Sequence, residues 1–287
     1  MLPDSQNYAK MKKNLCCFEG QISWIFNNLE DLKIKFVTHV GDLSNDDGDE
    51  EQFRRGFFQL GKLNGAVPYG ICAGNHDMSA DGTSPYFAKY FPENDTKNHY
   101  YWISSYDGNK HNAQRISLNG KDFLFIHLAY LPSDGAIEWA QRILEDNPDC
   151  YAIITTHAFL IKDWSERGIA RRQSRVSGTD FRIHKDGMNA GEDIYSKLVV
   201  PYKNVRMVLS GHYVGRDYLE LDVEGRRVHA ILADLETEKP YGGNGFLRII
   251  QFVPSEGKIY NYTYSPLLDA YKLGEYDSFV VDINDKI

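Results

Sequence analysis

The chain has 287 residues and a formal charge of −8, from 32 Lys and Arg against 40 Asp and Glu, and 42% of its residues are hydrophobic. This length and apolar content are enough for a large buried core and exclude a disordered protein. The acidic balance argues against a nucleic-acid-binding protein, because clustered Lys and Arg supply affinity for the phosphate backbone. No apolar run in the sequence approaches the roughly 18 residues that a membrane helix needs, so no membrane span is expected.

The first predicted elements are a helix and a buried strand. Apolar residues recur every three or four positions from Phe18 to Leu32, which is typical of one face of an amphipathic helix. The β-rich run Ile34–Val40 follows and stops at Gly41 and Asp42. Four later runs also end in polar residues: 67–72 before Gly-Asn-His-Asp, 123–126 before His127, 151–155 before Thr-His, and 205–209 before Ser-Gly-His. Helices are predicted between several of them, at 137–145 behind a Ser133/Asp134 cap and at 192–199 behind Asn189.

Strands that alternate with helices predict a parallel sheet, and ligands of such sheets gather beyond the carboxyl ends of the strands. From Arg226 the pattern changes to period-2 strands at 228–233, 246–253 and 258–264, which predicts a second, mainly antiparallel sheet. We expect one domain over residues 1–287, with second-sheet strands in 226–266, a C-terminal extension at 267–287, and inserted loops at 79–115 and 163–190. Long loops without periodicity are usually functional or disordered, and the second one is expected to overhang the site.

Polar motifs follow the strand-like runs in a fixed order. They are Asp4-x-Gln6, Gly41-Asp42-Leu43-Ser44-Asn45, Gly74-Asn75-His76-Asp77, Thr156-His157 and Gly211-His212. Carboxylate, amide and imidazole groups at one sheet edge are suitable ligands for one or two divalent ions such as Mn²⁺, Fe²⁺, Zn²⁺ or Co²⁺. An all-oxygen site would suit Ca²⁺ or Mg²⁺ better, and this one contains several histidines.

With these motifs the chain resembles the calcineurin-like metallophosphoesterase superfamily, whose ordered blocks are D-x-H, GDxxN, GNHD, a lone H and GHxH. It is most similar to a bacterial branch in which D-T-Q replaces D-x-H, and the segments Gly242–Arg248 and Thr263–Pro266 support the likeness. The resemblance covers roughly residues 3 to 266. It implies an α/β fold, a four-layer αββα sandwich of two mixed sheets flanked by helices.

The resemblance also implies a ligand set. Asp42 would bridge two metals, Asn75, His157 and His212 would complete the shell of the second metal, and Asp4 would serve the first. This sequence departs from the family pattern twice. Gln6 stands where the family has a metal-ligating His, and Val214 stands where the last His of GHxH is expected. The first metal is therefore labile, absent, or held by a neighbouring group that the sequence does not identify.

The function expected from these residues is hydrolysis of a small phosphomonoester or phosphodiester by metal-activated water. His76 would act as general acid or electrophile, oriented by Asp77. Candidate substrate-binding residues are Asn45, Tyr213, Arg171 and Arg172.

Several alternatives stay open. Asp and Asn after a strand are usually turn or cap residues, and His157 and His212 could be core histidines. The missing imidazoles leave two alternatives to the phosphoesterase: a catalytically weakened binding or scaffold protein, and a repurposed metal-dependent hydrolase. The partner is expected to be a small phosphoester and not a nucleic acid, with an undetermined oligomeric state. The chain starts almost on its first motif, so a soluble cytoplasmic protein and a mature exported protein are both compatible with the sequence.

Overall fold

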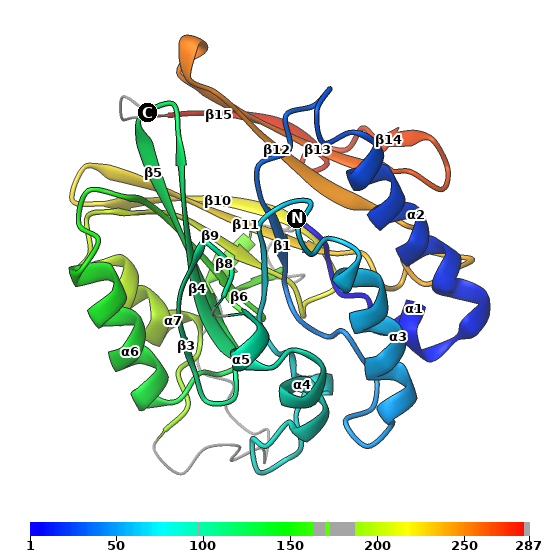
Figure 1. Cartoon of the computed structure of the whole chain (residues 1–287). Helices are drawn as coiled ribbons and strands as arrows, with labels where there is room; N and C mark the ends of the chain where they lie inside the picture. The colour runs from blue at the N-terminus through cyan, green and yellow to red at the C-terminus, as the bar shows by residue number, and fades with distance from the viewer. Residues whose placement is uncertain (97, 163–169, 173–186, 284–287) are drawn as a thin grey trace.

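The computed structural model describes residues 1–96, 98–162, 170–172 and 187–283 (Figure 1). The described chain forms two large β-sheets, covered by helices on their outer faces. Its shorter elements are the helices α1 (Gln6–Lys10), α4 (Pro85–Tyr90) and α5 (Glu93–Thr96), and the hairpin of β7 (Leu160–Lys162) with β8 (Ala170–Arg172). No helix in the described residues is both long and apolar enough to span a membrane.

The larger sheet has seven strands with a parallel centre. Their spatial order is β10 (Gly215–Val223), β11 (Arg226–Asp234), β9 (Val205–Ser210), β6 (Tyr151–Thr156), β5 (Lys121–Leu128), β4 (His111–Leu118) and β3 (Trp102–Tyr106). The four strands from β11 to β5 run parallel, and antiparallel strands flank them at both edges. The carboxyl ends of the central strands therefore meet at one edge of the sheet.

The second sheet is joined through the first two residues of the chain. β1 (Val37–His39) pairs parallel with β2 (Tyr69–Ile71), and Leu2 bridges to His39 on the other side. Met1 exchanges backbone hydrogen bonds with Arg248, which connects this part to β12 (Leu247–Val253). β13 (Lys258–Ser265) pairs antiparallel with β12, β14 (Ala270–Lys272) and β15 (Ser278–Asp282). Both sheets are therefore mixed, as predicted.

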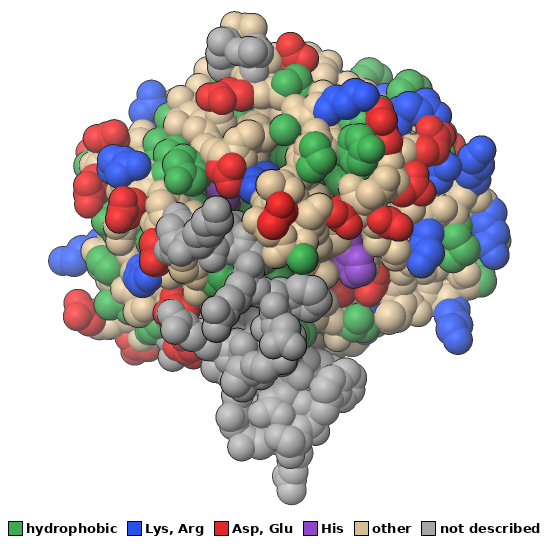
Figure 2. Space-filling view, turned by 90° about the horizontal axis from the view of Figure 1, so that it is seen from below, with side chains coloured by type: hydrophobic (Ala, Val, Ile, Leu, Met, Phe, Trp, Pro, Cys, Tyr) green, Lys and Arg blue, Asp and Glu red, His purple; other side chains and the backbone are tan. Residues whose placement is uncertain are grey.

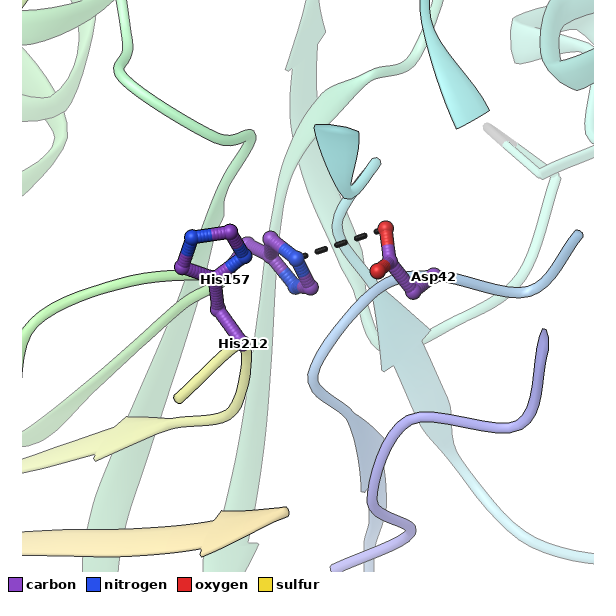
Figure 3. A group of neighbouring side chains, drawn as sticks. All are labelled: Asp42, His157 and His212. Carbon is purple, nitrogen blue, oxygen red and sulfur yellow. Dashed lines mark ion pairs between the residues drawn. The ribbon is translucent and has the colours of Figure 1, made fainter. Parts of the chain in front are cut away.

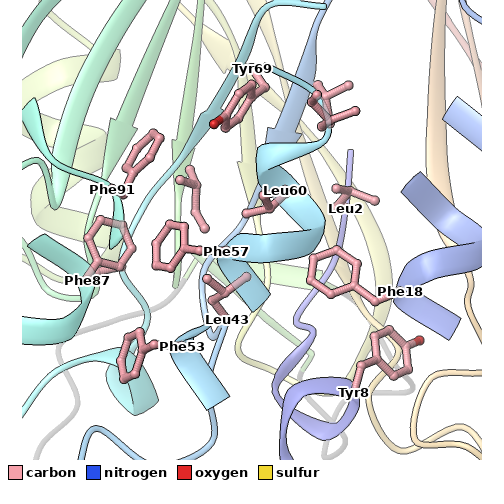
Figure 4. Packing of buried hydrophobic residues seen from close by; sticks show 14 of the residues in the cluster. Leu2, Tyr8, Phe18, Leu43, Phe53, Phe57, Leu60, Tyr69, Phe87 and Phe91 are labelled. Atoms are coloured by element: carbon pink, nitrogen blue, oxygen red, sulfur yellow. The ribbon is translucent and has the colours of Figure 1, made fainter. Parts of the chain in front are cut away.

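Three layers of apolar contacts hold the sheets and helices together. Helices α2 (Leu15–Asn27) and α3 (Glu50–Gly61) pack on the second sheet, where Phe18, Phe57 and Tyr69 belong to one cluster (Figure 4). Helix α6 (Asp134–Glu145) and helix α7 (Gly191–Ile194), which continues as a π-helical turn over Tyr195–Val199, pack on the larger sheet. Phe36 stacks on Phe125 between the sheets, with ring centroids 3.6 Å apart. The order of layers is αββα, which confirms the predicted fold.

Two predicted assignments differ from the structure. The strand predicted at 228–233 for the second sheet is β11, which belongs to the larger sheet, because the β10–β11 hairpin places it parallel to β9. Residues 79–115 are not a loop without structure, since they contain α4, α5, β3 and the start of β4. Polar side chains are buried in β4 and β3 carries a register shift, so neither strand shows apolar alternation. The second predicted loop, 163–190, lies outside the described residues except at 170–172, which form β8, and at 187–190.

Candidate metal centre

Four loops at the carboxyl ends of parallel strands supply the polar side chains. Asp42 follows β1, Asn75 and His76 follow β2, His157 follows β6, and His212 follows β9. The loops turn sharply, because Asp42 has φ +54° and His212 has φ +66°. Non-glycine residues adopt this left-handed region rarely, and it costs of order 1–3 kcal/mol when the surroundings enforce it. The strands thus bring together the predicted metal ligands that directly follow them.

Asp42, His157 and His212 form a compact group of possible metal ligands. One donor atom from each residue lies within 4.8 Å of the others, and their side chains point toward one another in Figure 3. The Nε2 atom of His157 is 3.3 Å from Oδ1 of Asp42 and 3.0 Å from Oδ1 of Asn75. Its Nδ1 donates to the Val40 carbonyl at 2.9 Å. Because a carbonyl can only accept, the proton of a neutral ring sits on Nδ1, and Nε2 offers its lone pair toward the two oxygens.

Asp42 and His157 shift each other's pKa values, and burial shifts that of His212. Burial would lower the pKa of His157, but the Asp42 carboxylate overrides it and raises that pKa above the usual value. Burial would raise the pKa of Asp42, and His157 instead brings it below the usual range. Burial, followed by the nearby His157, lowers the pKa of His212 to about 3. His212 therefore stays neutral, which is the form that binds a metal.

His76 and Asp77 occupy different places from those expected. His76 is half-buried, and its Nδ1 donates to the Asn45 carbonyl at 3.0 Å. Asp77 is fully buried and accepts from the backbone N–H groups of Leu43, Ser44 and Gly74 at 2.8–3.1 Å. The prediction that Asp77 orients His76 is therefore wrong. The carboxylate joins the two loops, and the Asn45 backbone fixes the imidazole.

The glycines of these motifs allow close approach of the chain. A Cβ atom at Gly74 would lie 2.0 Å from Oδ1 of Asp42, and one at Gly211 would lie 2.0 Å from Oδ1 of Asp4. Any larger residue would displace one of these carboxylates. The motifs therefore specify backbone space as well as ligand chemistry.

The N-terminal candidates lie beside this group. Asp4 is 2% exposed, and its Oδ2 accepts from the His212 N–H at 3.0 Å. Gln6 is 6% exposed, and its amide nitrogen donates to Oε2 of Glu236. Val214 is 40% exposed, and its side chain offers no ligand atom.

Sequence reasoning missed three residues around the site. Asp234, at the end of β11, is 1% exposed, and burial and the charge of Glu236 raise its pKa to about 7. Glu236 holds the Gln6 amide. The ring of Tyr130 lies 4.9 Å from that of His212 and 5.7 Å from that of His157. Asp234 is the last residue of a strand and Tyr130 follows one, so their position was an available signal.

Of the predicted substrate-binding residues, two can be placed. Asn45 lies beside His76 through the hydrogen bond described above. The Tyr213 ring packs edge-on against His212 with centroids 4.6 Å apart. The side chains of Arg171 and Arg172 lie outside the described residues.

The donor set fits a divalent cation. The Nε2 atom of His157 faces two oxygens, and atoms with lone pairs converge in this way only around a proton or a cation. Among the described residues, Oδ1 of Asp4, Oε1 of Gln6 and Oδ2 of Asp234 are also buried without a hydrogen-bond partner. Such groups are costly to bury unless they are paired or bind a metal.

The chain is an αββα sandwich with a group of possible metal ligands at its strand ends. The family model described as calcineurin-like phosphoesterase matches residues 17–215, and the chain belongs to this family. The chain is 33% identical over 300 residues to “Uncharacterized protein YvnB” of Bacillus subtilis (strain 168). The alignment covers 99% of this chain and 21% of that protein. This chain thus spans about a fifth of that relative's length.

Solved structures show the same fold at low identity. The purple acid phosphatase PPD1 from yellow lupin (Lupinus luteus) seeds aligns with a TM-score of 0.54 and 13% identity, over 92% of this chain and 49% of that chain. GAP50, the anchor in the inner membrane complex of Plasmodium, aligns with a TM-score of 0.53 and 10% identity, over 94% of this chain and 85% of that chain. At these identities the likeness is one of fold alone.

Proposed function

We propose that the chain hydrolyses small phosphoesters, either phosphomonoesters or phosphodiesters, with one or two divalent cations drawn from Mn²⁺, Fe²⁺, Zn²⁺ and Co²⁺. The convergence of Asp42, His157 and His212 carries this proposal. Membership in the calcineurin-like phosphoesterase family supports metal-dependent phosphoester hydrolysis.

The metal ligands in this proposal are Asp42, Asn75, His157 and His212. A divalent cation held there supplies Lewis acidity toward phosphoryl oxygens and lowers the pKa of a water molecule. The Val40 carbonyl fixes the ring of His157, and burial keeps His212 neutral. The protein thereby presents two preorganised imidazole donors without reorganisation during turnover.

His76 is the proposed general acid or electrophile. With Nδ1 held by the Asn45 carbonyl, Nε2 is the ring nitrogen free to face a phosphoryl or leaving-group oxygen. In the doubly protonated ring, Nε2 can pass its proton to the departing oxygen. The His76 backbone N–H donates to Oδ1 of Asp42 at 2.9 Å, which ties the acid to the ligand loop.

The charge distribution supports a small substrate over a polyanion. On the face seen in Figure 2, the Lys and Arg side chains of the described residues stand mainly around the rim, with acidic side chains between them. The net charge of −8 acts in the same direction, because a long nucleic acid would need a continuous basic track. A small phosphoester responds mainly to the local field of bound cations.

The test combines metal analysis with an activity assay. The purified chain should contain or take up Mn²⁺ and hydrolyse mono-aryl or bis-aryl phosphates. Asp42→Asn should lower turnover at least a hundredfold, because it weakens the proposed bridging ligand. Asp222→Asn is the matched control, since this carboxylate is exposed at the far end of the β10–β11 hairpin.

Absence of both metal and turnover would overturn the proposal and favour a binding or scaffold protein on this fold. Gln6 and Val214, which replace two imidazoles of the family pattern, are the residues that motivate this alternative. Metal uptake with no hydrolysis of either phosphate class would instead favour a repurposed metal-dependent hydrolase.

A further inference from the structure

An exposed lysine contacts the loop that fixes His76. Lys10 is the last residue of α1, and its Nζ atom donates to Oδ1 of Asn45 at 3.4 Å. The Asn45 carbonyl is the acceptor of the His76 Nδ1 proton, as described above. Lys10 and the proposed general acid therefore bind to the same residue, Lys10 at the Asn45 side chain and His76 at its backbone.

Helix α3 holds the backbone on both sides of this contact. The Asn45 N–H donates to Oε1 of Gln52 at 2.8 Å. Arg55 donates to the Ala9 carbonyl at 2.6 Å, at the end of α1. Both acceptor and donor side chains belong to α3, so this helix sets the separation of Lys10 and Asn45.

Lys10 also determines which end of the Asn45 amide is available. An ammonium group can only donate, so the atom that faces it is the amide oxygen. This contact leaves the NH₂ group of Asn45 for another partner, and asparagine NH₂ groups are suitable donors to phosphate oxygens. The ammonium and the amide together supply N–H donors beside the His76 loop.

The charge of Lys10 is available to an anionic ligand. Its neighbours in α3 are neutralised, since Arg54 and Arg55 form ion pairs with Glu51 at 2.7 and 3.3 Å. In the described part of the chain, no carboxylate forms an ion pair with Lys10, whose hydrogen bond goes to an uncharged amide. A lysine binds phosphate as a point charge, so an unneutralised ammonium at this place attracts a phosphoryl group.

We propose that Lys10, directly and through the Asn45 amide that it orients, binds the unesterified oxygens of a phosphomonoester and gives the chain a preference for monoesters over diesters. This rests on the proposed function and narrows its substrate class. A phosphomonoester carries about two negative charges at neutral pH, whereas a phosphodiester carries about one and has one unesterified oxygen fewer. The additional anionic oxygen of the monoester is the group that an extra ammonium and amide donor recognise.

The experiment compares hydrolysis of a mono-aryl and a bis-aryl phosphate by the Mn²⁺-loaded chain and its variants. The wild-type chain should have the higher kcat/KM for the monoester. In Lys10→Met, which removes the charge from an exposed side chain, the monoester-to-diester ratio of kcat/KM should fall about tenfold, mainly through a higher KM for the monoester. Lys10→Arg keeps the charge and should restore most of the ratio. Lys13→Met removes another exposed lysine and should behave as wild type.

Binding of inorganic phosphate separates this inference from the proposed function, because it needs no turnover. Isothermal titration calorimetry should show phosphate bound about tenfold more weakly by Lys10→Met than by wild type and Lys13→Met. An unchanged monoester-to-diester ratio in Lys10→Met, or a wild-type preference for the diester, would overturn the inference and leave the proposed function standing. Hydrolysis of neither ester, with phosphate affinity that still depends on Lys10, would overturn the proposed function, while the phosphate-binding role of Lys10 would stand.

Discussion

Backbone conformation at single residues shapes the candidate metal centre. Asp42 and His212 both have positive φ, and each makes a hydrogen bond to another segment of the site: Asp42 accepts from the His76 N–H, and the His212 N–H donates to Asp4. Strained residues persist only where the surroundings over-determine them. The hydrogen bonds that hold these two residues end on other residues of the site, so the residues of the site fix one another.

His76 provides the sharpest test at the residue scale. We expect His76→Ala to lower turnover by roughly 10²–10⁴-fold, the usual contribution of a general acid. Metal content should stay nearly unchanged, because no metal-ligand role is assigned to this ring and its backbone N–H remains in the variant. The measurements are steady-state hydrolysis of an aryl phosphate and metal analysis of the same sample.

A half-buried histidine away from these loops, His99, serves as the control for that substitution. His99→Ala should retain wild-type turnover. If His76→Ala also retains it, the general-acid assignment is refuted.

The sequence predicted site residues where a motif surrounds them and missed them where it does not. Asp42, Asn75, His157 and His212 stand in ordered motifs after strands, and the structure brings them together. Asp234 is the last residue of a strand, but a single carboxylate at a strand end resembles an ordinary turn residue. The order Gly-Asn-His-Asp also does not reveal that its acid, Asp77, faces backbone N–H groups.

Between elements, Asp77 acts as a brace for the loops after β1 and β2. Asp77→Ala would leave three buried N–H groups without their acceptor. At about 1–3 kcal/mol for an unsatisfied buried donor, and with some relief from water and from removal of a buried charge, we expect a loss of about 2–4 kcal/mol in the free energy of unfolding. Metal affinity should fall as well, since Asp42 lies in one of these loops. Urea denaturation and a Mn²⁺ titration measure the two effects.

Ser133→Ala is the control, because it removes a side-chain acceptor of a backbone N–H at a place away from the site. Ser133 caps α6 by accepting from the Ala136 N–H at 3.1 Å, and its removal should cost about 1 kcal/mol without altering metal affinity. An Asp77→Ala variant that binds metal as tightly as wild type would contradict the bracing role.

Elements were predictable to the extent that local signals define them. The Ser133 cap and the apolar face at 137–145 correctly predicted α6. The membership of β11 in the larger sheet was not predictable in this way, because period-2 alternation shows that a strand has a buried face but not which sheet it joins. Pairing partners depend on the hairpin with β10 and on the parallel contact with β9, which are both tertiary.

In the whole molecule, a buried polar network crosses between the two sheets behind the metal centre. Thr38 of β1 contacts Nε2 of His127 in β5 and Oγ1 of Thr155 in β6, each at 2.9 Å. His39 contacts Ser5 at 3.0 Å and accepts from the Gly41 N–H at 3.1 Å. Buried hydrogen bonds of this kind fix the registration of the layers they join. Here they align β1, which carries the Asp42 loop, with β6, which carries His157.

The same network predicts acid sensitivity of the fold. Burial, followed by the charge of His39, lowers the pKa of His127 to about 3 from an ordinary value of 6.5. Below pH 6.5 the unfolded chain takes up a proton at this residue and the folded chain does not. The contribution of His127 to the free energy of unfolding is therefore complete above pH 6.5 and is lost as pH falls toward 3, at up to about 1.4 kcal/mol per pH unit.

We expect His127→Asn to flatten the decline of stability with acid by up to about 1.4 kcal/mol per pH unit below about pH 5.5, whatever it does to stability at neutral pH. Urea denaturation of the metal-free chain between pH 7.5 and 4.5 gives the slope directly, and a chelator keeps release of metal ligands out of the comparison. Other groups titrate in the same window, Asp77 among them with a pKa that burial and the charge of Asp42 raise to about 6. Because they are present in both proteins, the difference between the two slopes isolates His127, and parallel curves would show that its imidazole takes up a proton in the folded chain as readily as in the unfolded one.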